Sequence, residues 1–397
     1  MKEDNLLSLS YGRIVRKDIA SNDGLLPDSY ETYQVVQPND VVFRLTDLQN
    51  DKRSLRTAIV NETGIITSAY LAVTPKEIDS RYFAYLLRFY DLTKVFYSMG
   101  GGLRQSMKYA DVKRLPVIMP SRSEQSAIAI FLDRETGKID ALIAEQEKLL
   151  TLLAEKRQAT ISHAVTRGLD PDAPMKDSGV PWLGEVPAHW EVRRLKTLSV
   201  FTTSGPRGWS DRITEEGSLF IQSGDLDDNL EVDFLNAKRV SVDDDAEAVR
   251  TRLADGDIVI CITGAKTGNV AVCGVIPEPA FVNQHLCLVR PSEEVHSRYL
   301  GLALKSRFGQ VQLDLSQYGL KQGLSLENIR ELLIVLPPHD EQLAIAAHLD
   351  AEAAKFDRLT DDATQAIALL KERRSALIAA AVTGKIDVRN EALETTA

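Results

Sequence analysis

The sequence predicts an α+β protein built from two tandem globular domains, each followed by a long helix. At 397 residues, the chain is about twice the size of a typical domain. Residues 115–166 align without a gap on residues 332–383, with 22 of 52 positions identical, so the chain is duplicated at an offset of 217 residues. Solenoid repeats are far shorter, roughly 20 to 50 residues, which favours two duplicated domains with pseudo-twofold symmetry.

The repeat and the local composition divide the chain into six segments. Residues 169–187 contain four prolines and are expected to form an exposed crossing between the copies. Residues 175–217 have no counterpart before Met1, so we expect the first domain to lack its amino-terminal part. The predicted segments are a first domain (1–120), a first long helix (121–168), a crossing linker (169–187), a second domain (188–338), a second long helix (339–384) and a tail (385–397).

Short runs of β-branched and aromatic residues between turn residues predict strands in both globular domains. In the first domain these runs cover residues 33–36, 41–43, 57–60, 65–67 and 69–73. In the second domain they cover residues 219–221, 258–262, 270–273 and 286–289. A helix is predicted near the end of each domain, over residues 80–96 and 297–315, so both domains combine strands with helices.

The long helices are predicted from their start signals and their apolar spacing. In both copies a proline precedes Glu-Gln, as at Glu124-Gln125, and either Ser121 or Ser123 is the expected cap of the first helix. Apolar residues then recur close to every 3.5 residues. A single helix with such an apolar stripe is about equally expected to be buried against its own domain. Two helices with similar stripes predict instead an antiparallel coiled coil with free outer faces. Nothing interrupts residues 138–166, a length of ~44 Å.

Composition excludes several classes of protein. No apolar stretch approaches the ~18 residues of a membrane span, and the amino terminus lacks a signal-peptide pattern. The three cysteines have no CxxC spacing, so we expect a reduced, cytoplasmic protein. The formal net charge of −10 argues against a polycation that coats nucleic acid, because non-specific DNA affinity comes mainly from phosphate neutralisation.

The motifs of common catalytic and metal sites are missing from the sequence. The stretch Gly264–Gly268 lacks the terminal Gly-Lys-Ser/Thr of a P-loop, and no GxGxxG follows a predicted strand. The six histidines share no metal-ligand spacing. The acidic run Asp243–Asp245 lies in a polar turn and is expected to be solvated surface. We therefore expect no catalytic residue, and no metal ion or cofactor bound by this chain.

Several motifs carry a resemblance to a known family. A proline followed by Glu-Gln-x-Ala-Ile-Ala occurs twice, over residues 120–129 and 337–346, and each copy continues into Leu-Asp. Residues 182–187 read Trp-Leu-Gly-Glu-Val-Pro, and Gly-Asp-Ile-Val (256–259) and Asn-Gln (283–284) follow. With these motifs and its duplication, the chain resembles the specificity (S) subunits of type I restriction-modification systems along essentially its whole length.

The resemblance implies a non-catalytic subunit that recognises double-stranded DNA. Each target-recognition domain in this family reads one half of a split, asymmetric site, and the paired helices form a spacer that holds two methylation (M) subunits. S-adenosylmethionine is then expected on those partners, and two restriction/translocation (R) subunits are further candidate partners. A spacer of ~44 Å spans roughly 13 base pairs.

The side chains expected to contact DNA are cations, glutamines and aromatic residues in predicted turns. Arg and Lys can hold phosphates or guanine edges, and Gln can bond adenine twice. The loop 102–105 is the strongest candidate because it recurs at 319–322; for the others, the alternative is a solvated cation or a glutamine that holds a turn. The candidates are Tyr11, Arg13, Arg44, Lys52, Arg53, Arg56, Arg104 and Gln105 in the first domain, and Arg207, Trp209, Gln222, Lys266, Gln284, Lys321 and Gln322 in the second.

Two other classes of function stay open at the level of sequence. The main alternative is a coiled-coil scaffold that organises protein partners without reading DNA; an autonomous enzyme is less favoured. Eleven acidic residues lie in the segment 224–257 of the second domain. If the chain does bind DNA, we expect weak, salt-sensitive affinity until partner subunits supply cations.

Overall fold

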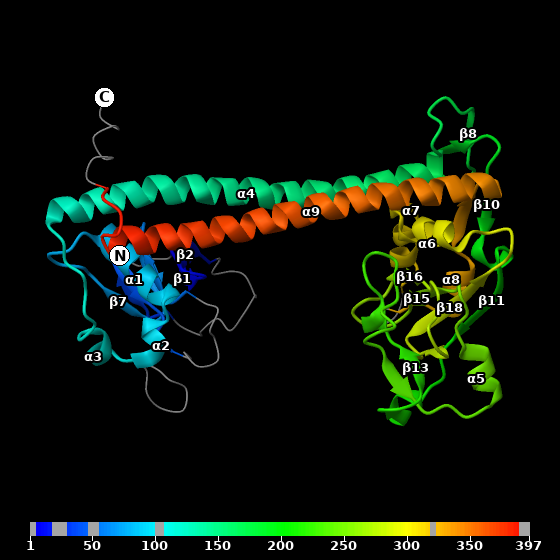
Figure 1. Ribbon diagram of the computed structural model, residues 1–397, viewed down its shortest axis with the longest axis horizontal. Coiled ribbons are helices and arrows are strands. Elements are labelled where there is room, and N and C mark those ends of the chain that lie inside the picture. Colours follow the sequence, from blue (N-terminus) through cyan, green and yellow to red (C-terminus); the bar gives the residue numbers. More distant parts are fainter. Residues whose placement is uncertain (1–4, 18–29, 47–54, 100–106, 318–322, 389–397) are drawn as a thin grey trace. The chain divides into compact units, whose positions relative to one another are not determined.

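The α+β class is confirmed by a computed structural model of the chain (Figure 1). The structure describes residues 5–17, 30–46, 55–99, 107–317 and 323–388. Two compact units are present: unit 1 comprises residues 1–148 and 363–397, and unit 2 comprises residues 149–362. The unit boundaries differ from the predicted domain boundaries because they cut both long helices, so each unit holds a globular module and a segment of each helix. No helix in the described ranges is long and apolar enough to cross a membrane.

The two long helices are antiparallel within each unit. Their bounds are Arg122–Arg167 for α4 and His339–Val382 for α9, against predicted ranges of 121–168 and 339–384. In unit 1, Asp140 of α4 pairs with Arg374 of α9 at 2.9 Å. In unit 2, Arg157 of α4 pairs with Asp357 of α9. Each arginine and each aspartate is separated from its counterpart by the 217-residue offset, so the same ion pair occurs twice with the helices exchanged.

Local signals explain where these helices begin and end. Ser121, and not Ser123, caps α4: Glu124 N donates to Ser121 Oγ at 3.3 Å and Ser121 N donates to Glu124 Oε2 at 3.0 Å. Gly168 follows α4 with φ +80° and Gly384 follows α9 with φ +72°, a backbone conformation that favours glycine.

Unit 1 consists of small sheets covered by short helices. The strands are β1 (Leu7–Ser10) and β2 (Arg13–Arg16) in a hairpin, β3 (Gln34–Val36) paired with β6 (Gly64–Ile66), and a sheet in the order β5 (Thr57–Ile59), β4 (Val41–Phe43), β7 (Leu71–Val73). The helices are α1 (Ser80–Leu92), α2 (Val95–Met99) and α3 (Tyr109–Val112). The predicted helix over 80–96 is divided at Lys94, whose φ of +62° is incompatible with a continuous α-helix. Phe43 and Tyr82 share the core with Ile378 of α9.

Unit 2 contains two four-stranded sheets. One has the order β11 (Ser199–Ser204), β18 (Leu286–Pro291), β15 (Ile258–Cys261), β16 (Val270–Val272), and the other has the order β12 (Ile213–Thr214), β14 (Lys238–Val240), β13 (Ser218–Ile221), β17 (Ala280–Val282). Two further pairs are β8 (Met175–Asp177) with β9 (Glu185–Pro187) and β10 (Glu191–Arg194) with β19 (Leu333–Leu336). The helices are α5 (Ala246–Thr251), α6 (Ser297–Lys305), α7 (Arg307–Leu315) and α8 (Leu326–Arg330), with 3-10 turns over Leu195–Thr197, Trp209–Arg212 and Ser223–Asp225.

The predicted exposed crossing over 169–187 is partly wrong. It contains the β8–β9 hairpin, and Val186 is fully buried. Trp182 stacks on Phe308 at 4.7 Å between ring centroids. Turn residues dominate this segment, but its few apolar side chains find partners in unit 2, which the local composition does not reveal.

The repeated Glu-Gln motif has the same structural role in both units. Gln125 accepts a hydrogen bond from Asp79 N and donates to Pro120 O, both at 2.8 Å. Its counterpart Gln342 accepts from His296 N at 2.8 Å and donates to Pro337 O at 3.0 Å. Both glutamines are buried. The motif thus ties the start of each long helix to the start of the module's main helix.

Candidate nucleic-acid interface

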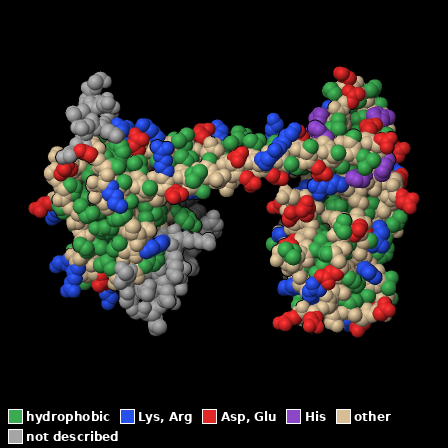
Figure 2. Space-filling model, viewed as in Figure 1, with side chains coloured by type: hydrophobic (Ala, Val, Ile, Leu, Met, Phe, Trp, Pro, Cys, Tyr) green, Lys and Arg blue, Asp and Glu red, His purple; other side chains and the backbone are tan. Residues whose placement is uncertain are grey.

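Charge alone does not mark an interface in unit 2. Acidic side chains are interleaved with Lys and Arg on the face seen in Figure 2. Some of the acids are paired with cations of the same unit, as in Asp257 with Arg290 at 2.7 Å and Glu278 with Arg239 at 2.6 Å. The more informative feature is a place where uncharged polar side chains converge from separate strands.

Two of the predicted glutamines meet at one edge of a sheet. β13 and β17 run parallel with Ile221 opposite Val282, so the residues that follow them leave the sheet at the same edge. Asn283 N donates to Ile221 O at 3.0 Å, and Gln222 and Gln284 come next along the chain. Both glutamines are half-buried. Parallel pairing therefore brings together two residues that are distant in sequence.

A loop that follows β15 reaches the same edge. Ile262 N donates to His285 O at 2.8 Å, and Thr263 Oγ1 lies 2.5 Å from His285 Nδ1. Gly264 has φ +106°, and no heavy atom lies within 4 Å of the position that a Cβ would take. Thr263 also forms a β-bridge with Gly323, the residue after the recurring loop. Lys321 and Gln322 lie outside the described residues.

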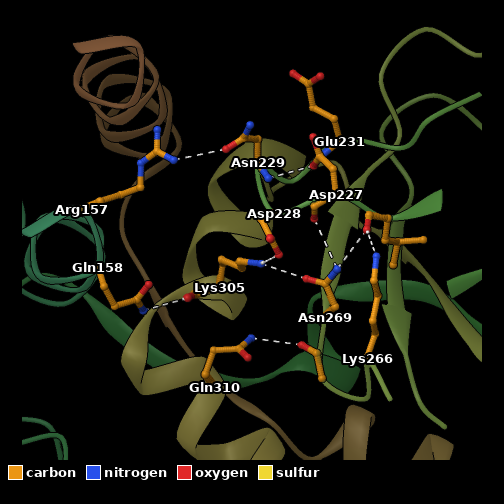
Figure 3. Close-up of polar contacts among 12 residues, drawn as sticks. Arg157, Gln158, Asp227, Asp228, Asn229, Glu231, Lys266, Asn269, Lys305 and Gln310 are labelled. Carbon is orange, nitrogen blue, oxygen red and sulfur yellow. Dashed lines mark hydrogen bonds and ion pairs between the residues drawn. The ribbon is translucent and has the colours of Figure 1, made fainter. Parts of the chain in front are cut away.

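Lys266 lies within this loop, and its ammonium group is held in place (Figure 3). Nζ donates to Leu226 O at 3.0 Å and approaches Gly224 O at 3.4 Å. Asp225, in the same turn, accepts from Gln222 N at 2.7 Å, and burial raises the pKa of its carboxyl. We name Gln222, Thr263, Lys266, Gln284 and His285 the recognition edge. Its amide, hydroxyl, imidazole and ammonium groups match the polar groups that bind base edges and phosphates.

The remaining candidates of unit 2, Arg207 and Trp209, differ in their exposure to solvent. Arg207 is exposed in the turn after β11. This turn runs against the recognition edge, because Gly205 N donates to Asn283 O at 3.2 Å and a Cβ on Gly205 would lie 2.1 Å from Val282 O. The prediction that Trp209 contacts DNA is wrong, since its side chain is 1% exposed in a core. Its ring contacts those of Phe220 and Phe281, with centroids 6.3 Å and 5.7 Å away.

The residues that follow β4 in unit 1 make the same backbone contact as the residues that follow β15 in unit 2. Met107 N donates to Leu45 O at 2.9 Å, as its counterpart Leu324 N donates to Ile262 O at 2.9 Å. Met107 is therefore bonded to the residue that lies two positions after β4, as Leu324 is bonded to the residue that follows β15. The candidates in the two loops that flank this junction, Lys52, Arg53, Arg104 and Gln105, lie outside the described residues.

Arg56 is wrong as a DNA contact because its side chain is fully buried. Its guanidinium donates to Thr46 O at 2.9 Å and lies 5.7 Å from the centroid of the Tyr97 ring. Arg44 is half-buried, and its backbone N donates to Arg56 O at 2.8 Å. These contacts give Arg56 a structural role, which is to hold the backbone that follows β4.

Tyr11 and Arg13 lie at the turn between β1 and β2. Tyr11 is exposed with φ +45°. Arg13 is also exposed, and its guanidinium lies 3.5 Å from Asp140 of α4. The turn therefore lies beside the helical segments of unit 1, and the structure joins Arg13 to a carboxylate there.

Sequence reasoning missed Thr263 and His285. Thr263 precedes Gly264 of the stretch that was compared with a P-loop, and His285 follows Gln284, but neither residue type alone indicates DNA contact. The useful signal was position: Thr263 lies two residues after the buried strand β15, and His285 lies in the short connection between β17 and β18. Their hydrogen bond to each other also depends on the β15–β18 pairing.

The three cysteines take no part in the recognition edge as nucleophiles. All are buried, and burial raises the pKa of the Cys261, Cys273 and Cys287 thiols. Thiols in such apolar surroundings stay protonated and unreactive. Among the described residues, no three His, Cys, Asp or Glu side chains gather as a metal site.

Comparison with known proteins relates these features to a family of DNA specificity domains. Residues 187–368 match the family model described as the type I restriction modification DNA specificity domain. The chain is 23% identical over 299 residues to the EcoKI specificity subunit of Escherichia coli K12, a match that covers 71% of this chain and 60% of that subunit. It is 25% identical over 281 residues to the Escherichia coli EcoBI specificity subunit, covering 68% of this chain and 58% of the relative.

Solved structures share the fold. A chain from a study of complex assembly and conformational transition of the type I R-M system superposes with a TM-score of 0.70 at 17% identity, covering 89% of this chain and 84% of that one. The HsdS subunit from Thermoanaerobacter tengcongensis superposes with a TM-score of 0.51 at 17% identity, covering 89% and 82%. The sequence matches and the shared fold agree with the duplicated motifs: residues 187–368 match the DNA specificity domain, and the chain as a whole is similar to type I restriction-modification specificity subunits.

Proposed function

We propose that the chain is a non-catalytic DNA sequence-specificity subunit of a cytoplasmic type I restriction-modification complex. The observation that carries the proposal is the recognition edge of unit 2, where Gln222, Gln284 and Lys266 lie in three loops that hydrogen bonds connect. Amide side chains at such an edge can bond adenine, and the fixed ammonium group can hold a phosphate. In this proposal each globular module reads one half of a bipartite site.

The two modules differ where they would read DNA, which supports an asymmetric site. In unit 1, residues 44–56 connect β4 to β5; in unit 2, the shorter segment 262–269 connects β15 to β16. These connections share almost no sequence. Loops of different length present different polar groups, so the two half-sites are expected to differ in base sequence.

The long helices are proposed to set the spacing of the half-sites and to dock two methylation subunits. Leu142 and Leu369 of unit 1 are 52% and 57% exposed, and their 217-residue counterparts Leu359 and Leu152 of unit 2 are 48% and 50% exposed. Large apolar side chains exposed on helices are typical of binding surfaces. Because the pair occurs twice, two copies of one partner fit better than one. S-adenosylmethionine is then proposed to bind to these partners, and restriction/translocation subunits to join the same complex.

The proposal is tested by methylome sequencing of cells that express the chain with its methylation subunits. Adenine methylation at a single bipartite sequence is expected, and it disappears when the gene is deleted. Gln284→Ala is expected to change the preference at one half-site only, because the edge belongs to one module. If the assembled complex selects no sequence from randomised DNA, the chain is instead a protein scaffold, for which the exposed leucines alone are sufficient.

A further inference from the structure

The ends of the long helices are part of the core of unit 2. Ala164 and Val165 of α4 and Ile345 and Leu349 of α9 are buried in one apolar cluster with Leu300 of α6. This cluster attaches the globular module to the helices at one place. The angle between the module and the helices then also depends on the contacts that the module makes with the helices further from this cluster.

Arg157 provides such a contact at a distance from the core. It lies seven residues before Ala164 on α4, which corresponds to about 10 Å along the helix axis. Its guanidinium donates to Asn229 Oδ1 of the globular module at 3.2 Å (Figure 3). It also donates to Ala353 O of α9 at 3.0 Å and to Asp357. One planar guanidinium thus joins both helices to the module, which a lysine ammonium could not do with the same geometry.

The segment that contacts Arg157 is fixed by its own packing and hydrogen bonds. We name residues 226–231 the Asn229 loop. Its two buried leucines, Leu226 and Leu230, anchor it in two different core clusters. Asn269 Nδ2 donates to Leu226 O and to Asp227 O, both at 3.3 Å. Lys305 Nζ in turn donates to Asn269 Oδ1 at 2.9 Å, and burial lowers the pKa of its ammonium group.

The Asn229 loop also reaches the recognition edge. Leu226 O, which accepts from Asn269, also accepts from Lys266 Nζ. A continuous set of hydrogen bonds therefore runs from Lys266 through the Asn229 loop to Arg157 and α9. All of these residues belong to unit 2.

Polar contacts, and not core packing, bridge the space between the helices and the Asn229 loop. A pocket of about 440 Å³ lies there, lined by residues that include Arg157, Asn229 and Phe356. Two other contacts cross near it: Gln158 Nε2 donates to Lys305 O at 3.0 Å and Arg298 pairs with Asp350 at 2.8 Å. At this pocket, therefore, the contacts that join the helices to the Asn229 loop are polar bonds.

We propose that Arg157 is a positioning residue that sets the angle of the unit 2 module on its helices, and thereby the length of DNA spacer that the protein accepts between half-sites. The inference rests on the proposed function. One added base pair shifts a half-site by about 3.4 Å and turns it by roughly 34°. A module free to pivot about its core attachment follows such a shift; a module held at Arg157 does not.

Unit 1 has the same ion pair between its two helices, but a different residue of the pair contacts the module. The counterpart pair Arg374–Asp140 joins α9 to α4, and Arg13 of β2 approaches Asp140 at 3.5 Å. In unit 1 the module thus contacts the aspartate, whereas in unit 2 it contacts the arginine. That each module attaches to the same ion pair in its own way supports an orienting role for the pair.

The test uses the chain assembled with its methylation subunits and duplexes that carry the two half-sites with the preferred spacer or one base pair more or less. Methylation rates are measured for the wild type, Arg157→Ala, and Arg157→Ala/Gln158→Ala. The expected result is a loss of about tenfold or more in discrimination between spacers, with the base preference at both half-sites retained. Lys355→Ala is the matched control, because its ion pair with Glu352 stays within α9.

The outcomes separate the inference from the proposed function. A wild-type complex that methylates no bipartite site would refute the proposed function. A wild-type complex with a clear spacer preference that Arg157→Ala leaves unchanged would refute the inference alone, as would an equal loss of base and spacer discrimination. If Arg157→Ala does not fold, Asn229→Ala removes only the module's end of the bond and carries the same expectation.

Discussion

The buried glutamine of the repeated motif bonds three backbone groups around the start of a long helix. Its replacement should destabilise the unit in which it lies. In unit 2, Gln342 donates to Pro337 O at 3.0 Å and to Glu294 O at 3.1 Å and accepts from His296 N at 2.8 Å. Gln342→Ala leaves these three backbone groups without their partner in a buried place. At about 0.5 to 1.5 kcal/mol for each hydrogen bond, we expect a loss of about 2 to 4 kcal/mol in the free energy of unfolding.

Tryptophan fluorescence gives a local readout of this change. The chain has three tryptophans, Trp182, Trp190 and Trp209, and all lie in unit 2. In urea, the fluorescence transition of Gln342→Ala should shift to lower concentration by roughly 1 to 2 M. Gln125→Ala, the same change in unit 1, is the matched control and should leave that transition almost unmoved. A shift below about 0.3 M for Gln342→Ala, or equal shifts for both variants, would contradict this expectation.

Three further predictions follow from burial and charge. Trp209→Ala should cost about 3 to 5 kcal/mol in urea unfolding, because the ring is in a core; weaker DNA binding without any loss of stability would contradict its assignment. DNA affinity of the free chain should fall steeply in a salt titration and be weaker than that of the assembled complex, whereas a salt-independent affinity would argue against phosphate contacts. Burial raises the pKa of Asp91 to about 6 from an ordinary value of 3.8, so its contribution to the stability of unit 1 is present at low pH and is lost as pH rises towards 6. Hydrogen exchange of residues 57–59 should therefore show this pH dependence in the wild type and not in Asp91→Asn.

Much of the helical architecture was predictable because its signals are local. A proline, Glu-Gln and an apolar stripe predicted both long helices to within two residues of α4 and α9. The duplication predicted that the helices pair, and two contacts in each unit confirm that they are antiparallel. In unit 1 Asp140 pairs with Arg374 while the start of α4 packs against the end of α9, and in unit 2 Arg157 pairs with Asp357 while the end of α4 packs against the start of α9. The strands β4 and β15 were also predicted from short apolar runs, because a buried strand needs β-branched and aromatic residues.

The candidate site was only partly predictable, because the exposure of a side chain is not encoded by its type. Arg56 and Trp209 have the chemistry of DNA contacts but are buried. Gln222 and Gln284 were singled out separately, and it is the parallel pairing of β13 with β17 that makes them neighbours. The strand β19 was missed altogether, since its partner β10 comes from the opposite end of the second domain.

The sequence by itself determined the duplication and the helix boundaries and showed the resemblance to type I specificity subunits, because repeats, caps and apolar periodicity can be recognised along the chain. Only the tertiary structure decided which polar residues share an edge and which cations are buried. It also revealed that Arg157 joins both helices to the Asn229 loop. The physical reason is that these contacts link residues far apart in sequence, so they depend on sheet order and on the close approach of the helices, which no local pattern specifies.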